Sequence, residues 1–98
     1  MNINALLMDP RDNVVTCVAD IPAGTVVIYR EGDTLKTLIA QEQIPYCHKI
    51  ALEDIPAGAD AIKYGESLGR MTKNVRKGCW VGHDNLISIP RDYDSEMI

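Results

Sequence analysis

The feature that most constrains the fold of this chain is a five-residue segment that occurs twice. Asp20-Ile21-Pro22-Ala23-Gly24 recurs as Asp54-Ile55-Pro56-Ala57-Gly58. Proline fixes φ, and glycine supplies the positive φ that lets the chain reverse into the next strand. The aspartate can either cap a single helical turn or seat an Asx turn. Two such turns predict a β structure built from two similar halves, and we interpret Asn74-Val75-Arg76-Lys77-Gly78 as a third, degenerate copy.

Short runs of β-branched and aliphatic residues separate these turns. Such runs, bounded by glycine and proline at short intervals, are typical of short strands. Strands are predicted at residues 13–19, 25–29, 34–39, 49–52, 60–64, 67–71, 79–81 and 86–89. We therefore expect an all-β fold with one or two single helical turns.

The length of 98 residues fits one domain, because domains usually contain about 50–200 residues. We expect a single domain over residues 1–98, with its core at about residues 13–89 and a charged C-terminal tail at residues 90–98. The chain has no phenylalanine, so its core must be aliphatic, with Trp80 and four tyrosines as the only large rings. A core this small would gain stability from a partner that covers it.

Charge and cysteine content narrow the partners and the compartment. The net charge of −4 argues against nucleic acid, because phosphate binding depends on clustered lysine and arginine. No run approaches the roughly 18 apolar residues that span a membrane, and the N-terminus lacks the pattern of a signal peptide. Three cysteines without a CxxC pair are typical of reduced thiols in a cytosolic protein. We therefore expect a soluble, cytoplasmic protein that binds neither nucleic acid nor membrane.

Candidate functional residues fall in three short segments. His48-Lys49 is either a solvated strand start or an anion site, where imidazole and ammonium meet the carboxylate of a sugar acid. Lys63-Tyr64-Gly65-Glu66 is either a plain strand end or a segment whose Tyr and Lys, on opposite faces, give one core contact and one polar contact. His83-Asp84-Asn85 is either a tight turn or a polar cluster at the rim of a site. Two histidines and scattered cysteines give no metal-ligand spacing, so no metal is expected in this chain.

Taken together, several motifs resemble one known family. They are His48-Lys49 followed by Ile50-Ala51-Leu52, then Ile62-Lys63-Tyr64-Gly65-Glu66, and then Trp80-Val81 with a closing Asn85. This set resembles the N-terminal region of altronate and galactarate dehydratases, and it is similar to the separate small subunit of sulfolactate sulfo-lyase. The resemblance covers most of the chain, from Val14 to Ile89. It implies a SAF-type domain with a β-clip fold.

The resemblance also implies a role in β-elimination. Members of the family remove water or bisulfite from sugar acids with a divalent metal, typically iron, that the large catalytic portion holds. This chain would then be the small, accessory subunit of a carbon–oxygen or carbon–sulfur lyase, acting with a separate large catalytic subunit on a sugar-acid or sulfonate substrate. His48 and Lys49 would receive the acidic substrate or shape the interface, and Asn85 would hydrogen-bond at the closing loop. The positions that match the family motif are His48, Lys49, Lys63, Tyr64, Gly65 and Asn85.

One segment departs from the family pattern. The family closes with Val-His-x-His-Asn, whereas this chain has Val81-Gly82-His83-Asp84-Asn85, so both expected histidine positions hold other residues. His83 lies between them and stays a candidate site residue, although adjacent strand positions face opposite sides. Two alternatives to the accessory subunit remain open. One is a free-standing SAF/β-clip module that binds a carbohydrate or sugar acid without catalysis, and the other is a structural or oligomerisation domain, such as a homo-oligomer.

Overall fold

The computed structural model describes residues 2–82 and 85–87. Within these ranges it contains strands and no helix, which confirms the all-β fold class. Accordingly, none of the described residues forms a helix long and apolar enough to cross a membrane. The strands are β1 (Ala5–Leu6), β2 (Val14–Cys17), β3 (Val26–Glu31), β4 (Thr34–Ile39), β5 (Lys49–Ala51), β6 (Asp60–Lys63), β7 (Glu66–Met71), β8 (Trp80–Val81) and β9 (Leu86–Ile87).

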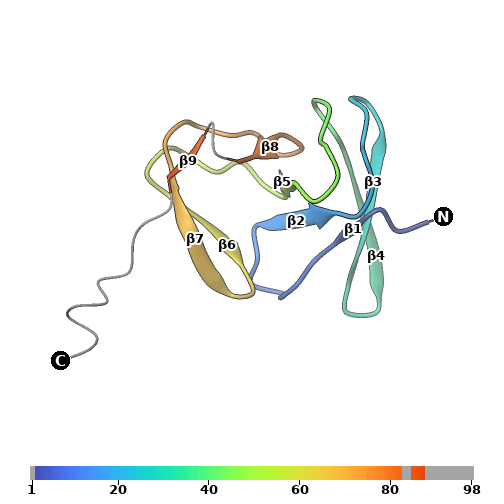
Figure 1. Cartoon of the computed structure of the whole chain (residues 1–98). Coiled ribbons are helices and arrows are strands. Elements are labelled where there is room, and N and C mark those ends of the chain that lie inside the picture. The colour runs from blue at the N-terminus through green and yellow to red at the C-terminus, as the bar shows by residue number, and fades with distance from the viewer. Residues whose placement is uncertain (1, 83–84, 88–98) are drawn as a thin grey trace.

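The strands form three antiparallel sheets, one of which lies between the other two (Figure 1). The central sheet has the strand order β1-β2-β5-β8, with the β3–β4 hairpin on one side and the β6-β7-β9 sheet on the other. Successive residues of a strand point to opposite faces. Val15 and Ile50 therefore face the β3–β4 hairpin, whereas Val14 and Ala51 face β6 and β7.

Each side of the central sheet has its own apolar core. The core under the β3–β4 hairpin includes Val15, Tyr29 and Ala5, the last of which lies upstream of the expected core at residues 13–89. The core under the β6–β7 hairpin includes Ala61 and Met71. The fold thus buries two small aliphatic clusters in place of one large core, in keeping with the lack of phenylalanine.

Four turns of the same design join the strands. Each turn begins at a buried aliphatic residue, and these residues pair as two isolated bridges, Ile21 with Ile44 and Ile55 with Val75. Three residues further on, each turn reaches a positive φ, at Gly24, Cys47, Gly58 and Gly78. The degenerate third copy at residues 74–78 is confirmed, and a fourth copy at residues 44–47 was not predicted.

The repeated aspartates hold the facing turn of each pair. The Asp20 carboxylate accepts a hydrogen bond from the Tyr46 amide at 2.8 Å, and the Asp54 carboxylate accepts one from the Lys77 amide at 2.9 Å. No single helical turn forms among the described residues, contrary to expectation. The reason is that positive φ at the glycine favours a β-turn, closed by the Thr25 amide donating to the Pro22 carbonyl.

Two asparagines anchor the two hairpins in the same way. The Asn4 amide group bonds to Val26 O and Ile28 N on β3, and its backbone N–H donates to Ile28 O. The Asn13 amide group bonds to Asp60 O and Ile62 N on β6, and its backbone N–H donates to Ile62 O. These matched contacts confirm the prediction of two similar halves. We call the half with β2 and the β3–β4 hairpin the first half, and the half with β5 and the β6–β7 hairpin the second half. A residue of β2 or β3 is equivalent to the residue 34 positions later, which is also the offset between Asp20 and Asp54.

The predicted strands agree with the observed ones within a few residues. The strand at residues 34–39 has the predicted bounds, whereas β1 was not predicted because Ala5-Leu6 carries no β-branched residue. The last two residues of the strand predicted at 86–89, the tail at 90–98, and His83 and Asp84 lie outside the described residues.

Candidate functional site

Two lysines from different elements lie near enough on one side of the central sheet for the charge of one to act on the other. Lys49 begins β5 and points toward the β6–β7 hairpin, and Lys63 ends β6. Their equivalents in the first half, 34 positions earlier, are Val15 and Tyr29. These two side chains are 0% and 8% exposed and belong to the core under the β3–β4 hairpin. The second half therefore has lysines at two positions where the first half has buried core residues.

The electrostatics of Lys49 are those of a partly buried cation beside another cation. Burial lowers the pKa of Lys49 below its ordinary value of 10.5, and the positive charge of Lys63 lowers it further. Both effects disfavour the charged ammonium, because burial removes water and a like charge repels. The negative charge of an anion placed between the lysines would oppose both effects, because it favours the charged ammonium. The arrangement is therefore suited to binding a carboxylate or sulfonate.

A threonine hydroxyl adds a polar group to the same face. Thr16 on β2 is the direct cross-strand partner of Lys49, so their side chains lie next to each other on the face toward the second hairpin. The Thr16 hydroxyl is buried and makes no hydrogen bond within the described part of the chain. A buried hydroxyl without a partner is costly, and a bound anion would provide an acceptor for it. We call Thr16, Lys49, Lys63 and Tyr64 the lysine site.

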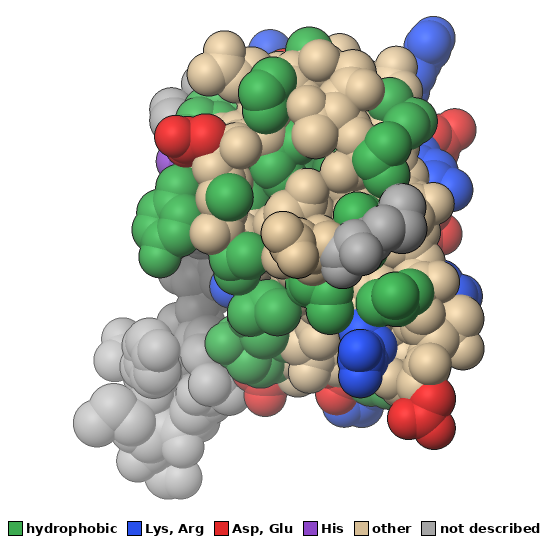
Figure 2. Space-filling view, turned by 90° about the vertical axis from the view of Figure 1, so that its right-hand side faces the viewer, with side chains coloured by type: hydrophobic (Ala, Val, Ile, Leu, Met, Phe, Trp, Pro, Cys, Tyr) green, Lys and Arg blue, Asp and Glu red, His purple; other side chains and the backbone are tan. Residues whose placement is uncertain are grey.

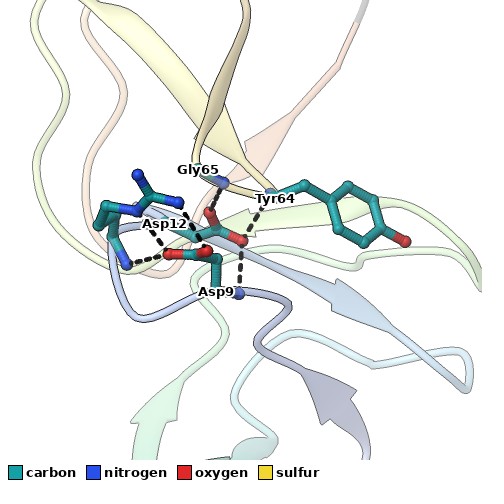
Figure 3. Close-up of polar contacts among 5 residues, drawn as sticks. Asp9, Asp12, Tyr64 and Gly65 are labelled. Carbon is teal, nitrogen blue, oxygen red and sulfur yellow. Dashed lines mark hydrogen bonds and ion pairs between the residues drawn. The ribbon is translucent and has the colours of Figure 1, made fainter.

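Tyr64 joins the site through Lys63. The Lys63 ammonium lies 5.3 Å from the centre of the Tyr64 ring, within the range of a cation–π contact. Tyr64 and Gly65 form the turn between β6 and β7 and have φ values of 57° and 71°. Figure 3 shows the Asp12 carboxylate next to this turn and the Tyr64 ring pointing away from it. The Tyr64 amide donates to Asp12 at 3.0 Å, and the Gly65 amide at 2.8 Å.

His48 lies on the opposite face of the central sheet from Lys49. Its ring packs edge-on against Trp80, with ring centres 4.7 Å apart, and Trp80 packs against the first core. The structure therefore does not bring His48 and Lys49 together on one face, although they are adjacent in sequence. Their joint contact with a substrate stays a prediction.

The Asn85 side chain hydrogen-bonds to the backbone of its own loop. Its side chain accepts from the Gly82 amide at 2.9 Å and donates to the Trp80 carbonyl at 2.7 Å. This chain has Gly82 at the first of the two histidine positions of the family pattern. A Cβ atom at Gly82 would lie only 2.8 Å from Nε1 of Trp80. The histidine that the family pattern places at position 82 would therefore displace the Trp80 ring. His83 itself lies outside the described residues.

In the described part of the chain, neither a cluster of metal-ligand side chains nor the pocket between two repeated turns coincides with the lysine site. The described residues contain no group of three or more histidine, cysteine, aspartate or glutamate side chains that could hold a metal ion. A pocket of about 310 Å³ lies between two of the repeated turns, and neither lysine lines it. Its lining residues are Asp54, Ile55, Pro56, Asn74, Val75 and Arg76.

Sequence reasoning missed Thr16 and Asp12. Thr16 lies in a β-branched strand, where threonine is ordinary, and only its pairing with Lys49 gives it a role. Asp12 lies in a loop, where aspartate is also ordinary. A signal was present, since Asp12 precedes Asn13 whereas Ile3 precedes the equivalent Asn4. The difference between Asp12 and Ile3 can be recognised only once the structure shows that Asn13 and Asn4 are equivalent.

The chain is similar in sequence to one protein family and to several known proteins. Residues 3–88 match the family model described as the altronate/galactarate dehydratase SAF domain. The chain is 37% identical over 81 residues to galactarate dehydratase (L-threo-forming) of Escherichia coli (strain K12), covering 81% of this chain and 14% of that protein. It is 32% identical over 83 residues to altronate dehydratase of the same strain, covering 85% of this chain and 16% of that protein. It is also 31% identical over 81 residues to (2R)-sulfolactate sulfo-lyase subunit alpha of Chromohalobacter salexigens, covering 80% of this chain and 86% of that subunit.

Proposed function

The chain belongs to the altronate/galactarate dehydratase SAF domain family, and we propose that it is the small subunit of a lyase that acts on a hydroxy acid. In this proposal a separate large subunit completes the enzyme, and water or bisulfite is the leaving group. The support is a relative that is itself named a subunit, (2R)-sulfolactate sulfo-lyase subunit alpha. The chain covers 86% of that subunit, and it spans 14% and 16% of the two dehydratases.

The observation that carries the proposed chemistry is the pair of lysines at positions that the first half fills with Val15 and Tyr29. Fold stability alone would favour an apolar pair there, because like charges repel and burial disfavours ammonium. We infer that Lys49 and Lys63 hold the acid group of the substrate, with the Thr16 hydroxyl as an additional donor. A charge-assisted hydrogen bond of this kind contributes about 1.5–3 kcal/mol.

β-Elimination next to a carboxylate also needs a base for the α-proton and a Lewis acid for the developing negative charge. The described residues do not offer a ligand set for a metal, so we assign both the base and a divalent metal, with iron as the expected ion, to the large subunit. The role of this chain is then to bind and orient the acid group. Its three cysteines are free, which fits our assignment of the enzyme to the cytoplasm.

The outer face of the β3–β4 hairpin is our candidate contact surface for the large subunit. Val26, Leu35 and Ile39 on this face are 39%, 48% and 47% exposed. Figure 2 shows this side of the molecule, where hydrophobic side chains are spread over the surface and charged ones lie mainly toward its margins. The equivalents of Val26 and Ile39 in the second hairpin are Asp60 and Arg70, which are paired in the same way and exposed. The backbone therefore tolerates charges at these positions, and apolar residues in the first hairpin indicate a covered surface.

The test is to express this chain together with a large subunit of the same family from the same genome. The pair would be isolated through a tag on this chain, supplied with ferrous iron and assayed on galactarate, altronate and (2R)-sulfolactate. We expect a stable pair whose activity requires both chains. The matched variants are Lys63→Tyr, which copies the first half, and Lys73→Tyr, an exposed lysine outside the lysine site. Only Lys63→Tyr should raise KM.

Two outcomes would contradict the proposal separately. A chain that elutes alone and adds nothing to the activity of the large subunit would exclude the subunit role. An active pair whose KM is unchanged by Lys63→Tyr would keep the subunit role and remove the lysine site from substrate binding.

A further inference from the structure

The turn that carries Tyr64 is held by a loop far from it in the sequence. Lys63 and Glu66 are paired across the hairpin, and the two residues between them both have positive φ. This is the geometry of a type I′ turn, in which asparagine followed by glycine is the preferred pair. Tyrosine is uncommon in the left-handed region, so its conformation at Tyr64 needs support from elsewhere.

Asp12 supplies that support. It is 7% exposed, and its carboxylate accepts hydrogen bonds from the Tyr64 and Gly65 amides and from the Asp9 amide at 3.1 Å (Figure 3). Arg11 covers the turn, because a Cβ atom at Gly65 would lie 2.3 Å from its guanidinium nitrogen Nη2. Hydrogen bonds from Arg11 in turn lower the pKa of Asp9 to about 2, which keeps that carboxylate charged. Residues 9–12 therefore form a preformed support for the turn.

The first half of the chain has no carboxylate at the position that corresponds to Asp12. Asn4 makes the same hairpin contacts as Asn13, and the residue before it is Ile3, which is partly exposed. The first hairpin ends in a turn at Gly32-Asp33, where glycine takes the positive φ. Within the described residues, no side chain hydrogen-bonds to the amides of that turn. The carboxylate at position 12 belongs only to the half that carries the lysine site.

We propose that Asp12 is a positioning residue for the lysine site. Its carboxylate keeps Tyr64 left-handed, so that the Tyr64 ring stays under the Lys63 ammonium and Lys63 stays directed at Lys49. Asp12 itself touches neither the substrate nor the reacting atoms. This inference rests on the proposed function, since it assumes that the lysine site binds the acid group of the substrate.

The test compares Asp12→Asn with Asp20→Asn in the complex of both subunits. Both aspartates accept backbone amides, but Asp20 holds a turn at Tyr46, outside the lysine site. We expect Asp12→Asn to raise KM for galactarate about tenfold and to change kcat less than twofold, because acid-group binding is loosened and the chemistry is not. Asp20→Asn should leave KM unchanged. In the full chain, amide hydrogen exchange at Tyr64 and Gly65 should be faster in Asp12→Asn only.

A second background separates positioning from general damage. Tyr64→Asn creates a turn that favours the type I′ conformation without help, and because it also removes the ring beneath the Lys63 ammonium it should raise KM by itself. If Asp12 acts through the turn, Asp12→Asn should raise KM in the wild-type background and have little effect when Tyr64→Asn is already present. An equal rise in KM in both backgrounds, or no rise in the wild type, would overturn the inference. If Lys63→Tyr raises KM while Asp12→Asn does not, only the role of Asp12 is lost, whereas failure of both removes the lysine site as well.

Discussion

In the first half of the chain, Val15 and Tyr29 fill the space between the central sheet and its hairpin, whereas Lys49 and Lys63 occupy the equivalent positions in the second half. On the outer faces of the hairpins the contrast is reversed. Val26 and Ile39 are apolar in the first half, and their second-half equivalents are charged. At these positions the first half is therefore apolar on both faces of its hairpin, and the second half is charged on both faces.

The contacts that the halves share are those that the backbone requires. Asn4 and Asn13 anchor the hairpins, and Asp20 and Asp54 hold the facing turns. The contacts that differ are the candidates for function, because the other half has the same architecture with different residues at those positions. The comparison thus selects the positions that a functional test should change.

The largest expected effect comes from replacing Lys49 and Lys63 with the residues that occupy the equivalent positions in the first half. In the double variant Lys49→Val with Lys63→Tyr, the lyase activity of the two-subunit enzyme should fall about 100-fold or more, because two charge-assisted contacts of about 1.5–3 kcal/mol each are lost. The free energy of unfolding of this chain should rise by about 1–2 kcal/mol, because charge repulsion is removed and apolar area is buried. Steady-state kinetics and urea unfolding measure the two effects.

The control for this swap is Lys77→Val with Lys73→Tyr, which removes two exposed lysines outside the site. It should change neither activity nor stability by much, because exposed charges contribute little. A double variant of Lys49 and Lys63 that loses stability together with activity would show that the lysines are structural.

The second expected effect concerns the outer faces. Val26→Asp with Ile39→Arg copies the charged pair that the second hairpin carries, so the chain should fold with its thermal midpoint nearly unchanged. Its affinity for the large subunit should fall at least tenfold, because charges would be buried at an apolar contact. Titration calorimetry or analytical gel filtration of the two subunits measures the change.

The reverse swap provides the matched control. Asp60→Val with Arg70→Ile alters the corresponding face of the second hairpin and should leave the affinity of the subunits unchanged. Equal losses of affinity in both swaps would show that the two faces do not differ in function.

The sequence predicted the strands and the turns better than it predicted the site. Turns marked by glycine were identified as copies of the repeat. The turn at Pro45-Tyr46 was predicted, but it was not identified as a fourth copy because cysteine stands where the other copies have glycine. Lys49 and Lys63 were each predicted from local motifs. Their proximity depends on how β6 packs against β2, the neighbour of β5, which local sequence does not specify. Asp12 was missed for the same reason, since its partners are more than 50 residues away at Tyr64 and Gly65.

The pH dependence of binding should reflect the lowered pKa of Lys49. Burial and Lys63 lower this pKa below its ordinary value of 10.5. The affinity for galactarate should therefore fall as pH rises through the lowered value, by about tenfold per pH unit, because the neutral amine no longer attracts the carboxylate. The folded state binds fewer protons at Lys49 than the unfolded state over this range. Wild type should thus gain stability relative to Lys49→Met as pH rises toward 10.5, and a constant difference in unfolding free energy would contradict the lowered pKa.

The smallest expected effect concerns the one repeated turn without glycine. Cys47 has a φ of 71°, a region in which a non-glycine residue costs about 1–2 kcal/mol. Cys47→Gly should raise the unfolding free energy by roughly 1 kcal/mol, after the greater freedom of glycine in the unfolded chain is subtracted. Gly24→Ala is the matched control, because it introduces strain at the equivalent point of another turn, where a Cβ atom would meet nothing within 4 Å. It should lower stability by a similar amount, so thermal midpoints should move in opposite directions by about 5 °C. If Cys47→Gly destabilised the chain instead, the exposed Cys47 side chain would have to make a stabilising contact that outweighs the strain of its backbone.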